Sequence, residues 1–217
     1  MIPFSWLYQR LLAAHGPQGW WPADGPLEIM AGALLVQRTT WEAAETALAA
    51  LRRADLLSPT GLAKAPPRTL EGLVRPAGFY RTKAARLRGL GQFLLREGGV
   101  EQLAAFPTGE LRRLLLTLPG IGPETADAIV LYAFGRPVVV IDAYLRRLSC
   151  RLLGTFEPPS DDDLRASIAS AITATADLNE FHALVIAHGK TVCAPRPDCS
   201  RCALRSGCRT GGATSEA

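Results

Sequence analysis

Apolar residues recur at helical spacing along most of this chain, and that periodicity constrains the fold more than any other feature. It predicts helices over residues 27–37, 41–54, 80–99, 109–118 and 123–134, and continues after Asp142 in the segments 143–154, 161–175 and 178–193. Residues 137–141, "PVVVI", form one β-like run, which is too short to start a sheet alone. Proline and glycine punctuate the segments between helices. The sequence therefore predicts an all-α fold with short loops.

Composition narrows the class of protein only modestly. The 217 residues are 48% hydrophobic and 20% charged, which is typical of a globular chain. A net charge of +4 is compatible with nucleic-acid binding but is weak evidence by itself. The chain contains no run of 18 apolar residues and no recognisable signal peptide, so we expect a cytoplasmic protein without membrane spans.

Four of the five cysteines crowd together near the end of the chain. Cys193, Cys199, Cys202 and Cys208 have the spacing C-x5-C-x2-C-x5-C. Four thiolates this close together suit zinc or an iron–sulfur cluster, and the residues alone do not separate the two. Two disulfides are the alternative, which a cytoplasmic location disfavours. Cys150 lies apart in an apolar helix and is expected to be buried.

A glycine-containing turn follows the predicted helix at 109–118. Gly120, Ile121 and Gly122 join it to a helix that begins with Pro123. Backbone N–H groups at such a helix N-terminus can bind a phosphate without any charged side chain. A plain helix–helix turn is the alternative interpretation.

The stretch "LPGIGPETADAIVLYAFGRPVVVID", residues 118–142, resembles the helix-hairpin-helix motif and trailing aspartate of the DNA glycosylase superfamily that includes endonuclease III. "AHGKTVC" and the cysteines after it resemble that family's entry into its [4Fe-4S] loop, although the first cysteine gap is one residue shorter here. The resemblance implies a [4Fe-4S] cofactor, with zinc as the alternative. It also implies two helical domains. One, residues 23–136, is a six-helix barrel that contains the motif at about 111–134. The other combines residues 1–22 with 137–217 and carries the cluster loop 193–208.

A second resemblance is closer in detail. "GWWPADGPLEIMAGALLVQRTTWEAA", "VRPAGFYRTKAARL" and "NEFHALVI" are similar to the 3-methyladenine DNA glycosylase III branch, which excises alkylated purines. That branch's known member lacks the cysteine cluster, so the chain combines features of two branches.

The resemblance implies roles for two acidic residues. Asp142 corresponds to the catalytic aspartate, which would stabilise an oxocarbenium-like sugar and take a proton from water. Asp142 is also well placed to cap the following helix. Glu124 stands where strand-cutting members keep a Schiff-base lysine, so lyase activity is expected to be absent or weak. Its alternative role is that of a first-turn acid that interacts favourably with the helix dipole.

Aromatic and polar residues complete the expected site. By similarity, Trp20, Trp21 and Pro22 line the pocket for a flipped base, with Trp41 opposite; filling of the core is the alternative for the tryptophans. Gln37 resembles the residue that fills the gap left by that base, and the expected DNA contacts are Gln37, Gly120, Ile121, Gly122 and Thr125.

The resemblance thus favours a monomeric, monofunctional base excision repair glycosylase that acts on alkylated purines in double-stranded DNA. The alternatives are an endonuclease III-like glycosylase and lyase for oxidised pyrimidines, and a DNA-binding paralogue without catalysis.

Overall fold

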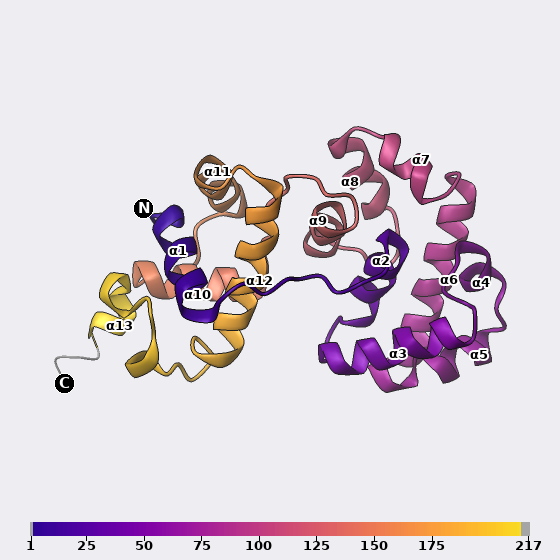
Figure 1. Ribbon diagram of the computed structural model, residues 1–217, viewed down its shortest axis with the longest axis horizontal. Helices are drawn as coiled ribbons and strands as arrows, with labels where there is room; N and C mark the ends of the chain where they lie inside the picture. The colour runs from indigo at the N-terminus through magenta and orange to yellow at the C-terminus, as the bar shows by residue number, and fades with distance from the viewer. Residues whose placement is uncertain (1, 214–217) are drawn as a thin grey trace. The chain divides into compact units, whose positions relative to one another are not determined.

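The computed structural model describes residues 2–213 and divides the chain into two compact units (Figure 1). One unit comprises Trp21–Arg136, and the other combines Met1–Trp20 with Pro137–Ala217. Each unit is helical, and the described residues contain no strand. None of the helices in the described part of the chain is long and apolar enough to cross a membrane.

The unit formed by residues 21–136 contains eight α-helices and one 3-10 turn. Their bounds are α2 Pro26–Leu35, α3 Trp41–Arg53, α4 Pro59–Lys64, α5 Pro67–Leu73, η1 Arg75–Ala77, α6 Tyr80–Arg96, α7 Val100–Ala105, α8 Thr108–Leu116 and α9 Pro123–Tyr132. Prolines open α2, α4, α5 and α9, where the missing N–H costs no hydrogen bond.

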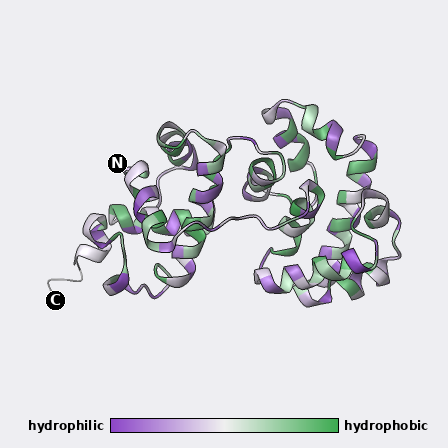
Figure 2. Cartoon of the chain, in the orientation of Figure 1, coloured by the Kyte–Doolittle hydropathy of each residue, from purple (hydrophilic) through white to green (hydrophobic). Residues whose placement is uncertain are grey.

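Helices α2 and α9 of this unit pack against each other (Figure 1). Both carry mostly apolar residues (Figure 2), and every α2 residue from Glu28 to Leu35 is buried. Helices α4 and α6 approach each other closely at Gly91, where a Cβ atom would lie 2.6 Å from the backbone nitrogen of Ala63. The hairpin between α8 and α9 is therefore built onto a packed helical core.

The other unit is built from the two ends of the chain. Its elements are α1 Phe4–His15, α10 Ala143–Leu153, α11 Asp161–Ala171, α12 Thr175–Thr191, η2 Cys199–Arg201, η3 Arg205–Gly207 and α13 Arg209–Ala213. Helix α1 packs on α12, with the rings of Phe4 and Phe181 edge to face. Helix α12 also packs on α10, where a Cβ atom on Gly189 would lie 2.5 Å from the ring of Tyr144.

The structure confirms the all-α prediction and refines the helix ends. The predicted helix at 80–99 ends at Arg96, and the one at 123–134 ends at Tyr132. The short helices α4, α5 and α7 were not predicted, because six or seven residues give too little periodicity to recognise. Residues 137–141, the β-like run, form no strand in the described part of the chain.

Candidate nucleic-acid interface and active site

An ion pair between α8 and α9 holds together the two helices that the hairpin joins. Arg112 on α8 donates from Nε to Oδ1 of Asp127 on α9 at 2.5 Å, and the Asp127 side chain is buried. Gly120 adopts φ +89°, a left-handed conformation that favours glycine, whereas Gly122 is extended. Gly122 is exposed at the N-terminus of α9 with no other atom near the position of a Cβ. The turn thus presents a bare backbone at the positive end of a helix dipole.

Gln37 lies directly against this hairpin. Its Nε2 donates to the carbonyl oxygen of Gly120 at 2.9 Å and to Oγ1 of Thr125 at 3.1 Å. Arg86 on α6 donates from a guanidinium nitrogen to Oε1 of Gln37 at 2.5 Å. The structure therefore brings together Gln37, Gly120 and Thr125, three predicted DNA contacts, and adds Arg86, which the sequence analysis missed. Ile121, a fourth predicted contact, is buried.

Phe79 is a further candidate that sequence reasoning missed. Its side chain is 60% exposed, and its backbone is left-handed at φ 46°. The guanidinium of Arg38 lies 5.3 Å from the centre of the Phe79 ring, and Arg38 is itself left-handed at φ 57°. An exposed aromatic ring on strained backbone beside Arg38, which follows Gln37 in the sequence, is a candidate for insertion between DNA bases. Phe79 could not be predicted as a candidate, because backbone strain at a residue other than glycine has no sequence signature.

Two of the predicted pocket tryptophans lie together. The rings of Trp21 and Trp41 are edge to face with their centres 5.3 Å apart, and Tyr132 from α9 lies 5.5 Å from Trp21. Trp21 also covers Gly32 on α2, where a Cβ atom would lie 3.1 Å from Cζ2 of the indole. Both tryptophans are partly exposed, so this cluster has an accessible surface as well as a packing role.

The remaining predicted pocket residues border this cluster in the sequence. Trp20 is partly exposed and belongs to the unit that contains the chain ends, whereas Pro22 is exposed and belongs to the hairpin unit.

Asp142 lies at the N-terminus of α10 and is buried, with 3% of its surface exposed. Its Oδ1 accepts a hydrogen bond of 2.7 Å from the backbone N–H of Leu145, which is the geometry of a helix cap. Its other oxygen, Oδ2, lies 3.7 Å from Nε2 of His182 on α12. The capping role is confirmed, and the imidazole of His182 faces the second oxygen of the same carboxylate.

Glu124 is exposed in the first turn of α9. The hairpin carries no lysine; the lysines of the chain are Lys64, Lys83 and Lys190. Lys83 is buried, and its Nζ donates to the carbonyl oxygens of Leu35 and Ala77 at 2.7 and 2.6 Å. Burial, together with the nearby charge of Arg86, lowers the pKa of Lys83. A lysine held between two carbonyls serves the packing of α6 rather than chemistry on DNA.

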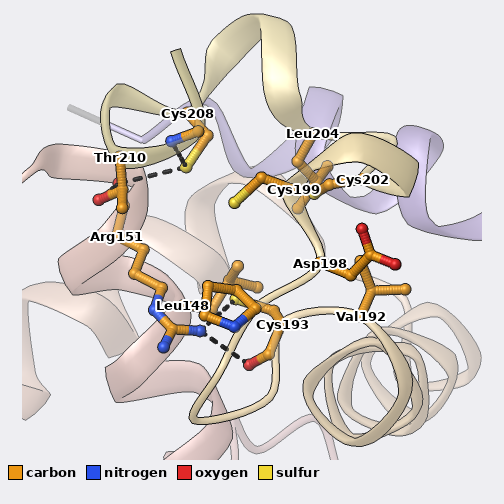
Figure 3. Close-up of a pocket in the computed structure, with 12 residues that line it drawn as sticks. Leu148, Arg151, Val192, Cys193, Asp198, Cys199, Cys202, Leu204, Cys208 and Thr210 are labelled. Carbon is orange, nitrogen blue, oxygen red and sulfur yellow. Dashed lines mark hydrogen bonds between the residues drawn. The ribbon is translucent and has the colours of Figure 1, made fainter. Parts of the chain in front are cut away.

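The four predicted metal-binding cysteines line one pocket (Figure 3). All are free thiols, so the disulfide alternative does not hold in this structure. Burial raises the pKa of Cys202, and the neighbouring Cys193, Cys208 and Cys199 raise it further. Arg151 on α10 donates to Sγ of Cys193 at 3.1 Å, and the backbone N–H of Gly211 donates to Sγ of Cys208 at 3.4 Å.

The side chains do not by themselves enclose a metal ion. Across residues 2–213, no group of three or more histidine, cysteine or acidic side chains has the geometry of a metal site. His188 lies next to one of the four cysteines. Its Nε2 is 3.6 Å from Sγ of Cys202, and its Nδ1 is 3.0 Å from Nε2 of His15. The donor set nevertheless fits a cluster, because the four thiols face one pocket and two of them receive N–H donors. Cys150, expected to be buried, is only half-buried near the end of α10.

The sequence matches known proteins over most of its length. Residues 31–173 match the HhH-GPD superfamily of base excision DNA repair proteins. A candidate DNA repair glycosylase of Methanocaldococcus jannaschii, MJ1434, is 35% identical over 93% of this chain and 94% of its own. Endonuclease III of Thermotoga maritima is 29% identical over 84% of this chain and 82% of its own. The chain therefore belongs to the HhH-GPD superfamily of base excision DNA repair glycosylases, as predicted.

Solved structures support the same assignment. The 3-methyladenine DNA glycosylase MagIII of H. pylori, bound to 1,N6-ethenoadenine, is 29% identical with a TM-score of 0.73 and covers 88% of this chain and 98% of its own. An endonuclease III–DNA complex has a TM-score of 0.80 over the full length of both chains at 22% identity, which shows the shared fold.

Proposed function

We propose that this glycosylase is monofunctional and hydrolyses the N-glycosidic bond of alkylated purines, such as 3-methyladenine, in double-stranded DNA, acting as a monomer. The observation that carries the proposal is that the chain has a buried carboxylate, Asp142, and has no lysine in its hairpin to act as a nucleophile. Hydrolysis needs a carboxylate beside the sugar, whereas a Schiff base needs an amine.

In this proposal Asp142 acts on the sugar. Its carboxylate stabilises positive charge on the sugar as the bond to the base breaks, and accepts a proton from the attacking water. The hydrogen bond from Leu145 holds one of the two carboxylate oxygens in place. The hairpin at Gly120–Gly122 binds a DNA phosphate through backbone N–H groups and α9's dipole. Gln37 and Thr125 lie close enough to the same turn to contact the DNA. Ile121 is buried and anchors the turn to the core of its unit.

The aromatic cluster supports alkylated purines as substrates. A base such as 3-methyladenine is cationic, so it leaves as a neutral molecule without a protein acid and is attracted to aromatic faces. Trp21 and Trp41 would supply such faces, together with Trp20 and Pro22, which flank Trp21 in the sequence. The similarity to a glycosylase that was solved with 1,N6-ethenoadenine, a modified purine, points the same way.

Endonuclease III-like action on oxidised pyrimidines is the second candidate, favoured by the 29% identity to an endonuclease III over most of the chain. A release assay on duplexes with 3-methyladenine, 7-methylguanine or thymine glycol, run with borohydride, separates the two. We expect release of the methylated purines, no trapped protein–DNA adduct, and no release by Asp142→Asn. Release of thymine glycol with a trapped adduct would establish the second candidate instead, and no release from any duplex would favour a non-catalytic DNA-binding protein.

Glu124→Lys completes the comparison. It places an amine where strand-cutting relatives keep theirs, and Glu124 is exposed, so the fold should tolerate the change. We expect the variant to form a borohydride-trapped adduct that the wild type and Glu124→Gln do not form.

We also propose that Cys193, Cys199, Cys202 and Cys208 hold a [4Fe-4S] cluster, with zinc as the alternative. When bound, such a cluster would tie the C-terminal loop together as a folding element. Arg151 and the backbone of Gly211 would then donate hydrogen bonds to its sulfur ligands. Iron and sulfide analysis of the purified protein distinguishes the two metals, and a colourless protein with one zinc ion would overturn the cluster.

A further inference from the structure

His182 faces the carboxylate proposed to carry out the chemistry. Its Nε2 lies 3.7 Å from Oδ2 of Asp142, and both side chains are buried, with 8% and 3% of their surfaces exposed. The other oxygen of Asp142 accepts the hydrogen bond from Leu145. The carboxylate is therefore approached by the helix backbone on one oxygen and by an imidazole on the other.

The position of His182 is fixed by the packing of α12 on α10. His182 and Gly189 are seven residues apart and share one face of α12. At Gly189 the two helices approach so closely that a Cβ atom would collide with Tyr144. Arg147 on α10 also donates to the carbonyl oxygen of Gly189 at 2.8 Å. Because α12 cannot slide along α10, the imidazole stays opposite Asp142.

We infer that His182 is a positioning residue, whose imidazole faces the second oxygen of Asp142 and holds the carboxylate in the orientation that stabilises the sugar cation. This inference rests on the proposed function, because it takes Asp142 as the group that acts on the sugar. A carboxylate anchored at one oxygen by Leu145 could still swing its second oxygen by small joint rotations about χ1 and χ2. A small misplacement of a reacting group can cost about 100-fold in rate.

Amide substitutions test the inference at the level of single atoms. The Nε2 of a glutamine lies near the position of the histidine Nε2, whereas the Nδ2 of an asparagine lies near the histidine Nδ1. We expect His182→Gln to retain single-turnover release of 3-methyladenine within about 5-fold, and His182→Asn and His182→Phe to lose about 10- to 100-fold. A purely structural role would not distinguish the two amides when their melting temperatures match.

A second measurement does not depend on turnover. Duplexes that carry a cationic pyrrolidine or a neutral tetrahydrofuran abasic analogue report the anionic character of the site through the ratio of their affinities. We expect the wild type and His182→Gln to prefer pyrrolidine, and His182→Asn to lose most of the preference. If all three proteins show the same preference and the same release rate, the positioning role is wrong. If Asp142→Asn also retains the preference, the proposed function of Asp142 fails, which is a separate outcome.

Discussion

Arg86 donates a hydrogen bond of 2.5 Å to Oε1 of Gln37, and thereby orients the amide whose nitrogen binds the hairpin at Gly120 and Thr125. Gln37 joins three segments that are distant in the sequence: the turn after α2, the middle of α6 and the hairpin. Gln37 is thus held before any DNA is present.

The first prediction concerns the coupling of this pair. Because the two side chains share one hydrogen bond, Arg86→Met and Gln37→Ala should destabilise the protein non-additively. We expect a coupling energy of about 0.5–3 kcal/mol in a double-mutant cycle of urea unfolding. Arg113→Met, which removes an exposed arginine from α8, is the control and should show no coupling with Gln37→Ala. Additive effects of Arg86→Met and Gln37→Ala would contradict the pairing.

The second prediction separates the two hairpin glycines. Gly120 has a positive φ, and a Cβ atom there would collide with Arg86. Gly120→Ala should therefore lower the free energy of unfolding, by about 1–3 kcal/mol. Gly122→Ala should leave stability unchanged, because Gly122 is extended and has open space at its Cβ position.

DNA affinity should respond differently. A methyl group on residue 122 would stand where the proposed phosphate approaches, so Gly122→Ala should weaken DNA binding at low salt although it folds normally. Fluorescence anisotropy with an abasic-analogue duplex measures this, and unchanged affinity would show that Gly122 does not contact the DNA.

The third prediction concerns Phe79. Phe79→Ala and Phe79→Gly both remove the exposed ring, so both should weaken DNA binding to a similar extent. The two variants should differ in stability, because alanine keeps the left-handed strain at φ 46° and glycine relieves it. We expect Phe79→Gly to be more stable than Phe79→Ala by about 1 kcal/mol in thermal unfolding. Unchanged DNA binding in both variants would assign Phe79 no role at the interface.

The sequence and the structure agree best where a local pattern decides the outcome. Periodicity located the long helices, and the residue type at position 142 was enough to predict a helix cap. The contacts of Gln37 and the exposed ring of Phe79 could not be predicted, because they depend on how α2 and α6 pack against the hairpin. His182 lies far from Asp142 in the sequence, and only the packing of α12 on α10 brings the two together.

The fourth prediction concerns the cysteine pocket. Replacing one proposed ligand, as in Cys199→Ser, should lower the bound iron and the absorbance near 400 nm and reduce the melting temperature. Cys150→Ser is the matched control: Cys150 is also a free thiol, but it is not among the residues that line the pocket. Equal metal content in the two variants would exclude Cys199 as a ligand.

The fifth prediction is a pH dependence that arises from Lys83. Burial lowers the pKa of Lys83 in the folded state below its usual value of 10.5, so the unfolded chain holds this proton more tightly. The contribution of Lys83 to the free energy of unfolding should therefore rise with pH between the folded pKa and 10.5. Lys83→Met removes that rise and leaves the carbonyls of Leu35 and Ala77 without their donor, at a cost of about 1–3 kcal/mol at pH 7. Chemical unfolding from pH 7 to pH 10 should show the gap between wild type and variant widening with pH. Lys64→Met, at an exposed position, should follow the wild type throughout, and a gap that narrows toward pH 10 would contradict the lowered pKa.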